Sequence, residues 1–192
     1  GALDERLRQD MQIELMELQR SLGITFVYIT HSQEEALTMS DRVVLMRFGQ
    51  IVQSGSPLDL FDRPESRFAA GFMGYENILE ATLVAREGTF GTVEFPGGLR
   101  IRGVVTASGP KVGDTVAIAL RAERISPVST VTPDSVEATI TSRIYRGKYT
   151  DVTVATGAGP LRLRSWHGGA GEAEEIQRVG WNTTEAVIFA AQ

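Results

Sequence analysis

The hydrophobic pattern of this 192-residue chain changes abruptly near Tyr75. Before that residue, helical periodicity alternates with apolar runs. After it come short β-rich runs punctuated by glycine and proline, namely NILEATLVA, GTVEF, LRIRGVV, TVAIALR, VEATITSRIY, YTDVTVAT, PLRLRS and EAVIFAA. The two patterns call for different architectures, so the sequence predicts two domains, residues 1–74 and 75–192.

The first domain is expected to be α/β. Apolar residues recur every three or four positions over 7–22, which predicts an amphipathic helix with Asp4 as its cap and Gly23 at its end. The run ITFVYIT (24–30) is almost continuously apolar, as in a parallel strand buried on both faces. The other expected elements are a helix at about 33–39, two strands about a turn at Gly49, and helices starting at SPLDLF and within 64–74.

The second domain is expected to be a small all-β barrel or sandwich, because its short strands are evenly spaced and separated by turn residues. It contains a weak internal echo: KVGDTVAIAL (111–120) resembles RVGWNTTEAVIFAA (178–191). Two similar lobes, or one barrel with a repeated hairpin, would both explain the echo.

Composition excludes several classes of function. The net charge of −5 argues against a general nucleic-acid binder. The chain has no cysteine, which excludes disulfides and thiolate metal sites, and its two histidines are far apart, so we predict no metal site. No run of 18 apolar residues occurs, and the start GALDERLRQDMQ has no apolar secretory segment.

His31 is the first candidate functional residue. It follows the apolar run 24–30 directly and precedes the expected helix, which places it at the carboxyl edge of an α/β sheet, where ligands bind. A histidine there can donate a hydrogen bond to a phosphate, and the following helix N-terminus favours an anion. A histidine satisfied by backbone at a strand end would show the same position.

The first domain resembles the last third of an ABC-transporter ATPase, of the import type that serves maltose, polyamines and ferric iron. Ala2, Leu3 and Asp4 resemble the D-loop, and THSQEEAL resembles the H-loop, with His31 as the γ-phosphate switch. DRVVLMRFGQIVQSGSPLDLF and PESRFAAGFMG resemble the closing strand pair and helices. The resemblance implies that Ala2, Leu3, Asp4 and His31 take part in nucleotide binding and that His31 is also catalytic.

This sequence departs from the family pattern at several places. Gly1 stands where the family usually has serine, and Ser32 stands where aspartate is common. No G-x-x-x-x-G-K-[ST] phosphate loop, L-S-G-G-Q signature or Walker B strand is present in the 192 residues. The resemblance therefore implies ATP and Mg²⁺ in an intact subunit, but no cofactor and no ATPase activity for this chain alone.

The second domain resembles the transport-associated, OB-like regulatory domain of the same ATPases. VGDTVAIALRAERISPV carries the family's Arg121 and Glu123, with Ala122 in place of the usual proline. ATITSRIYRGKYTDVTVAT resembles the strand pair that follows, with Tyr145 and Gly147 near its turn. These four residues are expected to serve regulation or ligand binding.

The predicted protein is thus the C-terminal segment of a cytoplasmic ATPase subunit. The resemblance implies a homodimer, docking on transmembrane permease subunits at the inner face of the membrane, a small-molecule effector, no nucleic acid, and uptake of a polyamine, ferric iron, an opine or a similar solute. The alternative is a stand-alone small-ligand-binding or dimerisation module with no ATPase role. A weaker third interpretation is an OB-type nucleic-acid binder that uses the basic and aromatic side chains of SRIYRGKY (142–149).

The predicted strand 24–30 raises a folding problem. A strand buried on both faces needs neighbours at both edges, and residues 1–74 supply few. We therefore expect this part of the chain to be disordered, rearranged or covered by a second copy.

Overall fold

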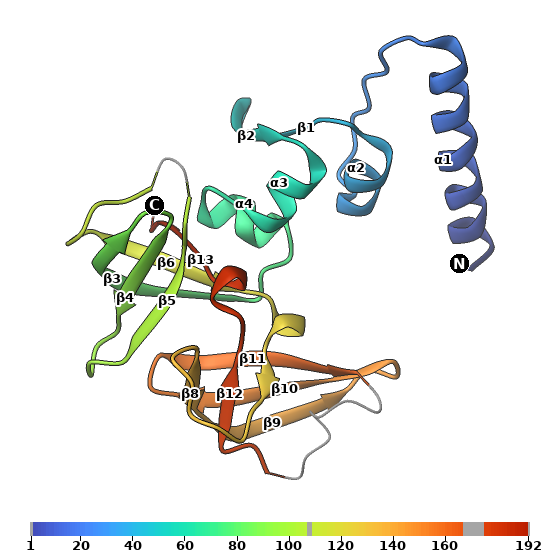
Figure 1. Ribbon diagram of the computed structural model, residues 1–192. Helices are drawn as coiled ribbons and strands as arrows, with labels where there is room; N and C mark the ends of the chain where they lie inside the picture. The colour runs from blue at the N-terminus through green and yellow to red at the C-terminus, as the bar shows by residue number, and fades with distance from the viewer. Residues whose placement is uncertain (1, 107–108, 167–174, 192) are drawn as a thin grey trace. The chain divides into compact units, whose positions relative to one another are not determined.

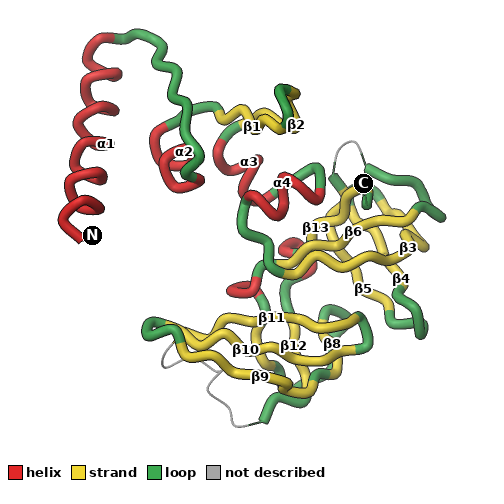
Figure 2. Tube along the Cα trace, turned by 180° about the vertical axis from the view of Figure 1, so that it is seen from behind, coloured by secondary structure: helices red, strands yellow, loops and turns green. Residues whose placement is uncertain are grey.

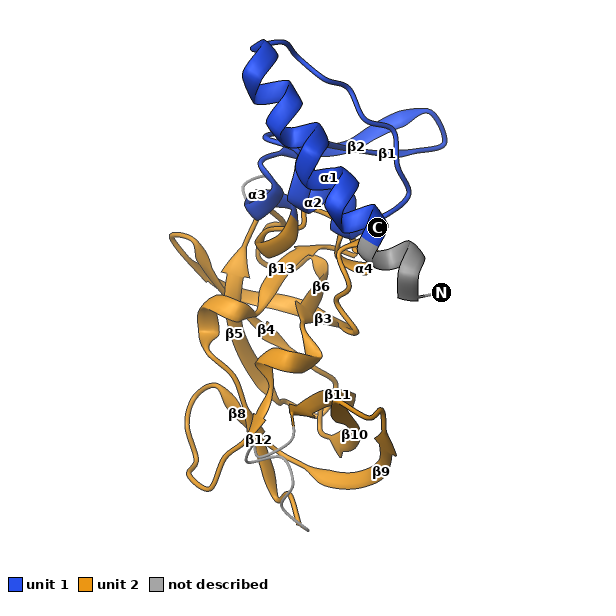
Figure 3. Ribbon diagram, turned by 90° about the vertical axis from the view of Figure 1, so that its right-hand side faces the viewer, with its two compact units in different colours: residues 1–60 blue, residues 61–192 orange. Residues whose placement is uncertain are grey.

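The computed structural model describes the backbone of residues 2–106, 109–166 and 175–191, and the side chains of these residues from Leu7 onward. The chain divides into two compact units, Gly1–Leu60 and Phe61–Gln192, which Figure 3 colours separately. The division falls earlier than the expected boundary near Gly74. The physical reason is that Phe61, Asp62 and Arg67 accept or donate hydrogen bonds with side chains of the β-rich part.

The first unit contains helices and one small hairpin. Its elements are α1 (Ala2–Leu22), α2 (Gln33–Met39), β1 (Val43–Arg47), β2 (Gln50–Gly55) and the start of α3 (Pro57–Asp62). The tube in Figure 2 shows their succession along the chain. The β1–β2 turn places Phe48 and Gly49 at φ 50° and 78°, the left-handed pair that tight antiparallel hairpins require. The predicted hairpin about Gly49 and helix at 33–39 are confirmed.

The predicted strand at 24–30 is wrong in this structure. The segment is an irregular connection, and the side chains of Val27 and Ile29 are 86% and 99% exposed. A strand exists only when its N–H and C=O groups pair with a neighbour. In the described part of unit 1, the sheet consists of β1 and β2 alone, paired antiparallel, so no α/β sheet forms there.

A closed five-stranded barrel forms the first lobe of the second unit (Figure 1). The strands are β3 (Asn77–Glu87), β4 (Phe90–Glu94), β5 (Arg100–Val105), β6 (Thr115–Leu120) and β13 (Val187–Ala190). Their order around the barrel is β13-β5-β4-β3-β6. β13 runs parallel to β5, whereas every other neighbouring pair is antiparallel. The predicted all-β, OB-like barrel is therefore confirmed.

A second lobe is inserted between β6 and β13, and we call residues 126–180 the inserted lobe. One of its sheets has the order β11-β10-β9 and the other β7-β12-β8. The strands are β7 (Ser126–Pro127), β8 (Ser135–Glu137), β9 (Thr139–Tyr145), β10 (Tyr149–Thr156), β11 (Gly159–Trp166) and β12 (Arg178–Gly180). The chain passes between the lobes twice, through the 3₁₀ turns η1 (Ala122–Arg124) and η3 (Thr183–Glu185).

One apolar cluster runs through both lobes, from Ala81 in the barrel to Val154 and Leu163 in the inserted lobe. The alternation of side chains along each strand explains the cluster: β11 buries Leu161 and Leu163, while Arg162 between them faces outward. Helix α4 (Arg67–Phe72) precedes the barrel, with Ser66 as its cap and Gly74 (φ 82°) after its end. None of the described helices is long and apolar enough to cross a membrane.

Candidate functional site

His31 lies in a turn that its neighbours hold firmly. The Thr30 hydroxyl donates to the Glu35 carboxylate and accepts the Ser32 N–H at 2.9 Å, and the Ser32 hydroxyl caps α2 by accepting the Glu35 N–H at 3.3 Å. These bonds fix the backbone on both sides of the histidine. The His31 side chain itself is exposed. Sequence reasoning thus placed His31 correctly before α2, but not at the edge of a sheet.

The residues that resemble the D-loop belong to helix α1. Ala2, Leu3 and Asp4 lie in the first turn of α1, so Asp4 is inside the helix instead of capping it, and their side chains lie outside the described ones. Among the described side chains, none forms a hydrogen bond or ion pair with His31, and no group of three or more His, Cys, Asp or Glu side chains could hold a metal ion. The nucleotide-binding role of these residues stays a prediction.

The second predicted group, Arg121 and Glu123, lies at the crossing between the two lobes. Arg121 is only 5% exposed, and its guanidinium lies over the rings of Phe61 (3.6 Å to the centroid) and Tyr75 (4.3 Å). Its Nη2 donates to the Phe61 carbonyl oxygen at 2.8 Å. Burial of a cation is costly unless the charge is compensated, and here two aromatic faces and a carbonyl supply the compensation. Arg121 therefore anchors the end of α3 to the barrel.

Tyr75 completes this anchor. Its hydroxyl donates to the Asp62 carbonyl oxygen at 3.3 Å. Burial raises the pKa of Tyr75 to about 12, because the phenolate would be poorly solvated, and the nearby Arg121 charge only partly opposes this. Tyr75 is thus neutral over the whole physiological range and acts as a packing and hydrogen-bonding group.

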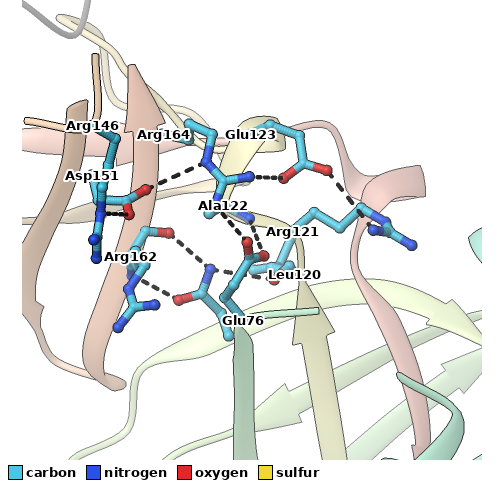
Figure 4. A network of polar contacts seen from close by, with 10 residues as sticks. Glu76, Leu120, Arg121, Ala122, Glu123, Arg146, Asp151, Arg162 and Arg164 are labelled. Atoms are coloured by element: carbon cyan, nitrogen blue, oxygen red, sulfur yellow. Dashed lines mark hydrogen bonds and ion pairs between the residues drawn. The ribbon is translucent and has the colours of Figure 1, made fainter. Parts of the chain in front are cut away.

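Glu123 belongs to a larger ionic network, drawn in Figure 4. Its carboxylate lies 3.8 Å from Arg121 Nη1 and 3.8 Å from Arg164 Nη1. Arg164 also pairs with Glu76 (Nη2 to Oε1, 3.0 Å) and Asp151 (Nε to Oδ1, 3.3 Å), so one guanidinium is shared by three carboxylates. The Arg164 pKa is raised: burial alone would lower it, but Glu76 and Asp151 outweigh that effect.

Two further contacts tie this network to the barrel. Glu76 Oε2 accepts the Ala122 N–H at 3.1 Å, at the start of η1. Asn77, 4% exposed, donates from Nδ2 to the carbonyl oxygens of Leu120 (3.2 Å) and Arg162 (2.8 Å) and accepts the Arg162 N–H at 2.7 Å. The Asn77 amide thereby pairs with the edge of β11 as a neighbouring strand would.

Tyr145 and Gly147 lie on the β9–β10 hairpin. Tyr145 ends β9 with its side chain 69% exposed, and Gly147 (φ 84°) forms the turn. Between them, Arg146 bonds to Asp151 (Nε to Oδ2, 3.4 Å), which is the carboxylate that Arg164 also contacts. The hairpin therefore joins the ionic network through Arg146, which lies between the two residues that the sequence had singled out.

Sequence reasoning missed Glu76, Asn77, Asp151 and Arg164. Asn77 and Arg162 are 85 positions apart, as Glu76 and Arg164 are 88 apart, and no local pattern links them. A usable signal was the polar pair Glu76–Asn77 immediately before the apolar alternation of β3. Where the fold buries such a pair, its polar groups need hydrogen-bond partners elsewhere in the chain.

The barrel with its inserted strands defines an OB-like class of β domain. A model of the TOBE domain matches residues 118–189, which run from β6 through the inserted lobe into β13. The cytoplasmic molybdate-binding protein ModG has a similar fold, with a TM-score of 0.52 and 14% identity over 60% of this chain and 96% of that one. At this identity the likeness concerns the fold alone.

Similar sequences identify the larger context. Spermidine/putrescine import ATP-binding proteins PotA are 39% identical in Rubrobacter xylanophilus (98% of this chain, 51% of that protein), 40% in Frankia alni (93% and 41%) and 41% in Roseobacter denitrificans (86% and 46%). The chain therefore belongs to the family of ABC-importer ATP-binding subunits with a TOBE domain and corresponds to their C-terminal region. It spans about half the length of these relatives.

Proposed function

We propose that this chain forms the C-terminal part of an importer subunit that couples ATP hydrolysis to the uptake of a small solute. The observation that carries the proposal is the alignment of 98% of the chain with an import ATP-binding protein at 39% identity. Because the relatives' names specify spermidine and putrescine, a polyamine is the solute we favour over ferric iron or an opine.

Exposed apolar side chains in the first unit support this proposal. The stripe of α1 includes Leu7, Met11, Leu18 and Leu22, all about half exposed, and the β1–β2 hairpin exposes Val44, Met46 and Ile51. Apolar area of this extent is normally covered in a stable protein. In the intact subunit, we expect the additional sequence that the relatives possess to cover it and to pair with residues 24–30 as a strand.

His31 is the residue through which this chain would act on the nucleotide. ATP with Mg²⁺ would supply the phosphate group that is transferred to water. The exposed imidazole would donate a hydrogen bond to that phosphate, and the bonds of Thr30 and Ser32 would hold its backbone in place. The D-loop residues Ala2, Leu3 and Asp4 would contribute to the same site from the neighbouring subunit of a dimer.

The test uses the longer subunit with His31→Ala. Hydrolysis is expected to fall by about 10²-fold or more, the usual effect of losing one positioned transition-state donor, while ATP binding persists. His167→Ala, which removes the other histidine of the chain, is the matched control and is expected to leave hydrolysis unchanged. Hydrolysis at the wild-type rate in His31→Ala would refute the assignment.

The β unit would serve regulation and homodimer contact. In this proposal the subunit is cytoplasmic and reaches the inner face of the membrane only by docking on permease subunits. Sedimentation of the longer subunit tests the dimer, and co-purification with detergent-solubilised permease tests the docking. A monomeric subunit that hydrolyses ATP with wild-type coupling would remove the dimerisation role.

An open cleft of about 680 Å³ in the inserted lobe favours a second candidate function, the binding of a small ligand. Its lining is mostly polar and includes Ser129, Glu137, Thr139, Thr156 and Arg178. Inorganic phosphate and spermidine are suitable probes, titrated into the chain by calorimetry. Saturable phosphate binding that Arg178→Met abolishes, or saturable spermidine binding that Glu137→Gln abolishes, would support a stand-alone binding module, whereas no heat at millimolar concentration would reject it for these ligands.

A further inference from the structure

A line of alternating charges connects the hairpin of the inserted lobe to the end of helix α3. We call it the polar relay, and its members are Arg146, Asp151, Arg164, Glu123, Arg121 and Phe61. The successive contacts are 3.4, 3.3, 3.8 and 3.8 Å between charged groups, and 2.8 Å from Arg121 Nη2 to the Phe61 carbonyl. Figure 4 shows its charged members facing one another around η1.

We propose that the polar relay couples the β9–β10 hairpin to the C-terminal end of α3, with Arg164 as the positioning residue at its centre. A displacement of the hairpin changes how Arg164 divides its contacts among its carboxylates, and Glu123 carries the change to Arg121. The coupling is a property of this chain. Its regulatory meaning, control of the ATPase by the β domain, rests on the proposed function.

The two ends of the polar relay differ in exposure, as the proposal requires: one end can be contacted from solvent and the other is fixed in the protein. Arg146 is half exposed, with its side chain at 52%, and it lies between the exposed Tyr145 and the turn at Gly147. Arg121 at the other end has a side chain only 6% exposed and is held between two aromatic rings. A contact made at the hairpin therefore meets an exposed charge, whereas the charge at the helix end is buried and held between two rings.

The middle of the relay is partly shielded from solvent. The side chains of Arg164, Asp151 and Glu123 are 22%, 10% and 28% exposed. Charges in such a place are screened by salt less than surface charges are. Glu123 contacts both arginines at 3.8 Å, beyond hydrogen-bond length, so it is the member most easily displaced.

A second branch gives Arg164 its central position. Through Glu76, at 3.0 Å, Arg164 also reaches the N–H of Ala122 at the start of η1. Both branches converge on the segment 121–123, which connects β6 to the inserted lobe. Removal of Arg164 therefore breaks both routes, whereas removal of Arg146 leaves both routes in place and changes only the contact that feeds them at the hairpin.

The experiment is a double-mutant cycle on the 192-residue chain, read by amide hydrogen exchange. Arg146→Met is expected to change exchange about threefold at Phe61 and Ala122, far from the substitution, because coupled groups share interaction energy. In an Arg164→Met background, the same substitution is expected to affect only the hairpin amides. Arg162→Met, on the same face of β11, is the matched control background and should preserve the distant effect.

Two outcomes would overturn the proposal. One is an Arg146→Met effect confined to the hairpin, and the other is a distant effect that persists without Arg164. Should Arg164→Met fail to fold, judged by the fluorescence of Trp181, Arg164→Lys keeps the charge but loses the fork geometry and takes its place, with at least a twofold weakening of the distant effect expected.

The regulatory meaning is tested separately in the longer subunit. There, Arg146→Met should change the rate of ATP hydrolysis about twofold or more, and the change should vanish together with Arg164. An unchanged rate would refute control of the ATPase by the β domain, even if hydrogen exchange demonstrates the coupling within the chain. Since the exchange experiment needs neither nucleotide nor permease, failure of the proposed function leaves its result standing.

Discussion

Asn77 offers the sharpest test of how the two lobes of the β unit are joined. Its side chain makes three hydrogen bonds, one to the end of β6 at Leu120 and two to the backbone of Arg162 in β11. Asn77→Ala removes all three and leaves the Arg162 N–H and carbonyl without their partner. Each bond contributes about 1 kcal/mol, and each polar group left unpaired in a buried place costs about 1 kcal/mol more.

The expected loss of unfolding free energy is therefore about 3–5 kcal/mol, a large part of the 5–15 kcal/mol typical of a domain. Asn77→Asp should be at least as harmful, because it keeps the acceptor for the Arg162 N–H but turns a carboxylate oxygen toward two carbonyls. Urea denaturation followed by circular dichroism and by the fluorescence of the buried Trp181 measures both variants.

The control is Asn182→Ala. Asn182 is exposed and accepts the Thr184 N–H at 3.0 Å in η3, where water can replace it, so about 1 kcal/mol or less should be lost. If Asn77→Ala costs no more than this control, the side-chain amide does not join β11 to the barrel and the reasoning fails.

Two other predictions concern the barrel and its anchor. Gly103→Ala in β5 should destabilise the chain by about 2–4 kcal/mol in the same urea assay, because the added Cβ would lie 2.7 Å from the Ala186 carbonyl oxygen; a loss under about 0.5 kcal/mol would contradict the close approach. Between about pH 10 and 12 the unfolded Tyr75 loses its proton while the folded one keeps it, so stability is intact below pH 10 and falls by about 3 kcal/mol in total as pH rises through 12. Tyr75→Phe should remove this part of the alkaline loss, and identical pH profiles for the two proteins would refute it.

The β unit could be predicted from the sequence because its signals are local. Each of the eight β-rich runs overlaps a strand, since alternation and glycine-rich turns act over a few residues. The internal similarity between 111–120 and 178–191 corresponds to one barrel, because its two copies lead into β6 and β13, which are neighbouring strands. What could not be predicted is that β13 closes the barrel parallel to β5, because that pairing joins residues more than 80 positions apart.

The candidate site was predictable only in part. Arg121 and Glu123 do lie together, but as members of a network in which Arg121 is buried against Phe61 and Tyr75. Nothing in the local sequence distinguishes a buried arginine with two aromatic partners from an exposed one. Whether any of these residues binds a ligand stays a prediction.

The first unit shows where local pattern reaches its limit. The run 24–30 has the composition of a buried strand, yet a strand is a property of paired chains, and no pairing partner lies in the described part of the unit. The second unit differs because the apolar side chains of its strands pack against one another in one buried cluster. The same kind of apolar run therefore folds in one unit and remains an exposed connection in the other.

This difference makes a final prediction. Phe26 and Tyr28 lie in the irregular segment, so brief chymotrypsin digestion of the chain should cut there at least about tenfold faster than within the barrel strands β3 to β6, where hydrogen bonds between strands protect the backbone. Mass spectrometry of the first fragments locates the cut. In the longer subunit, where 24–30 should pair as a strand, the same bonds should resist cleavage. Equal cleavage in both proteins would mean that the additional sequence does not cover this segment, and the assignment of residues 1–74 to a nucleotide-binding domain would lose its structural basis.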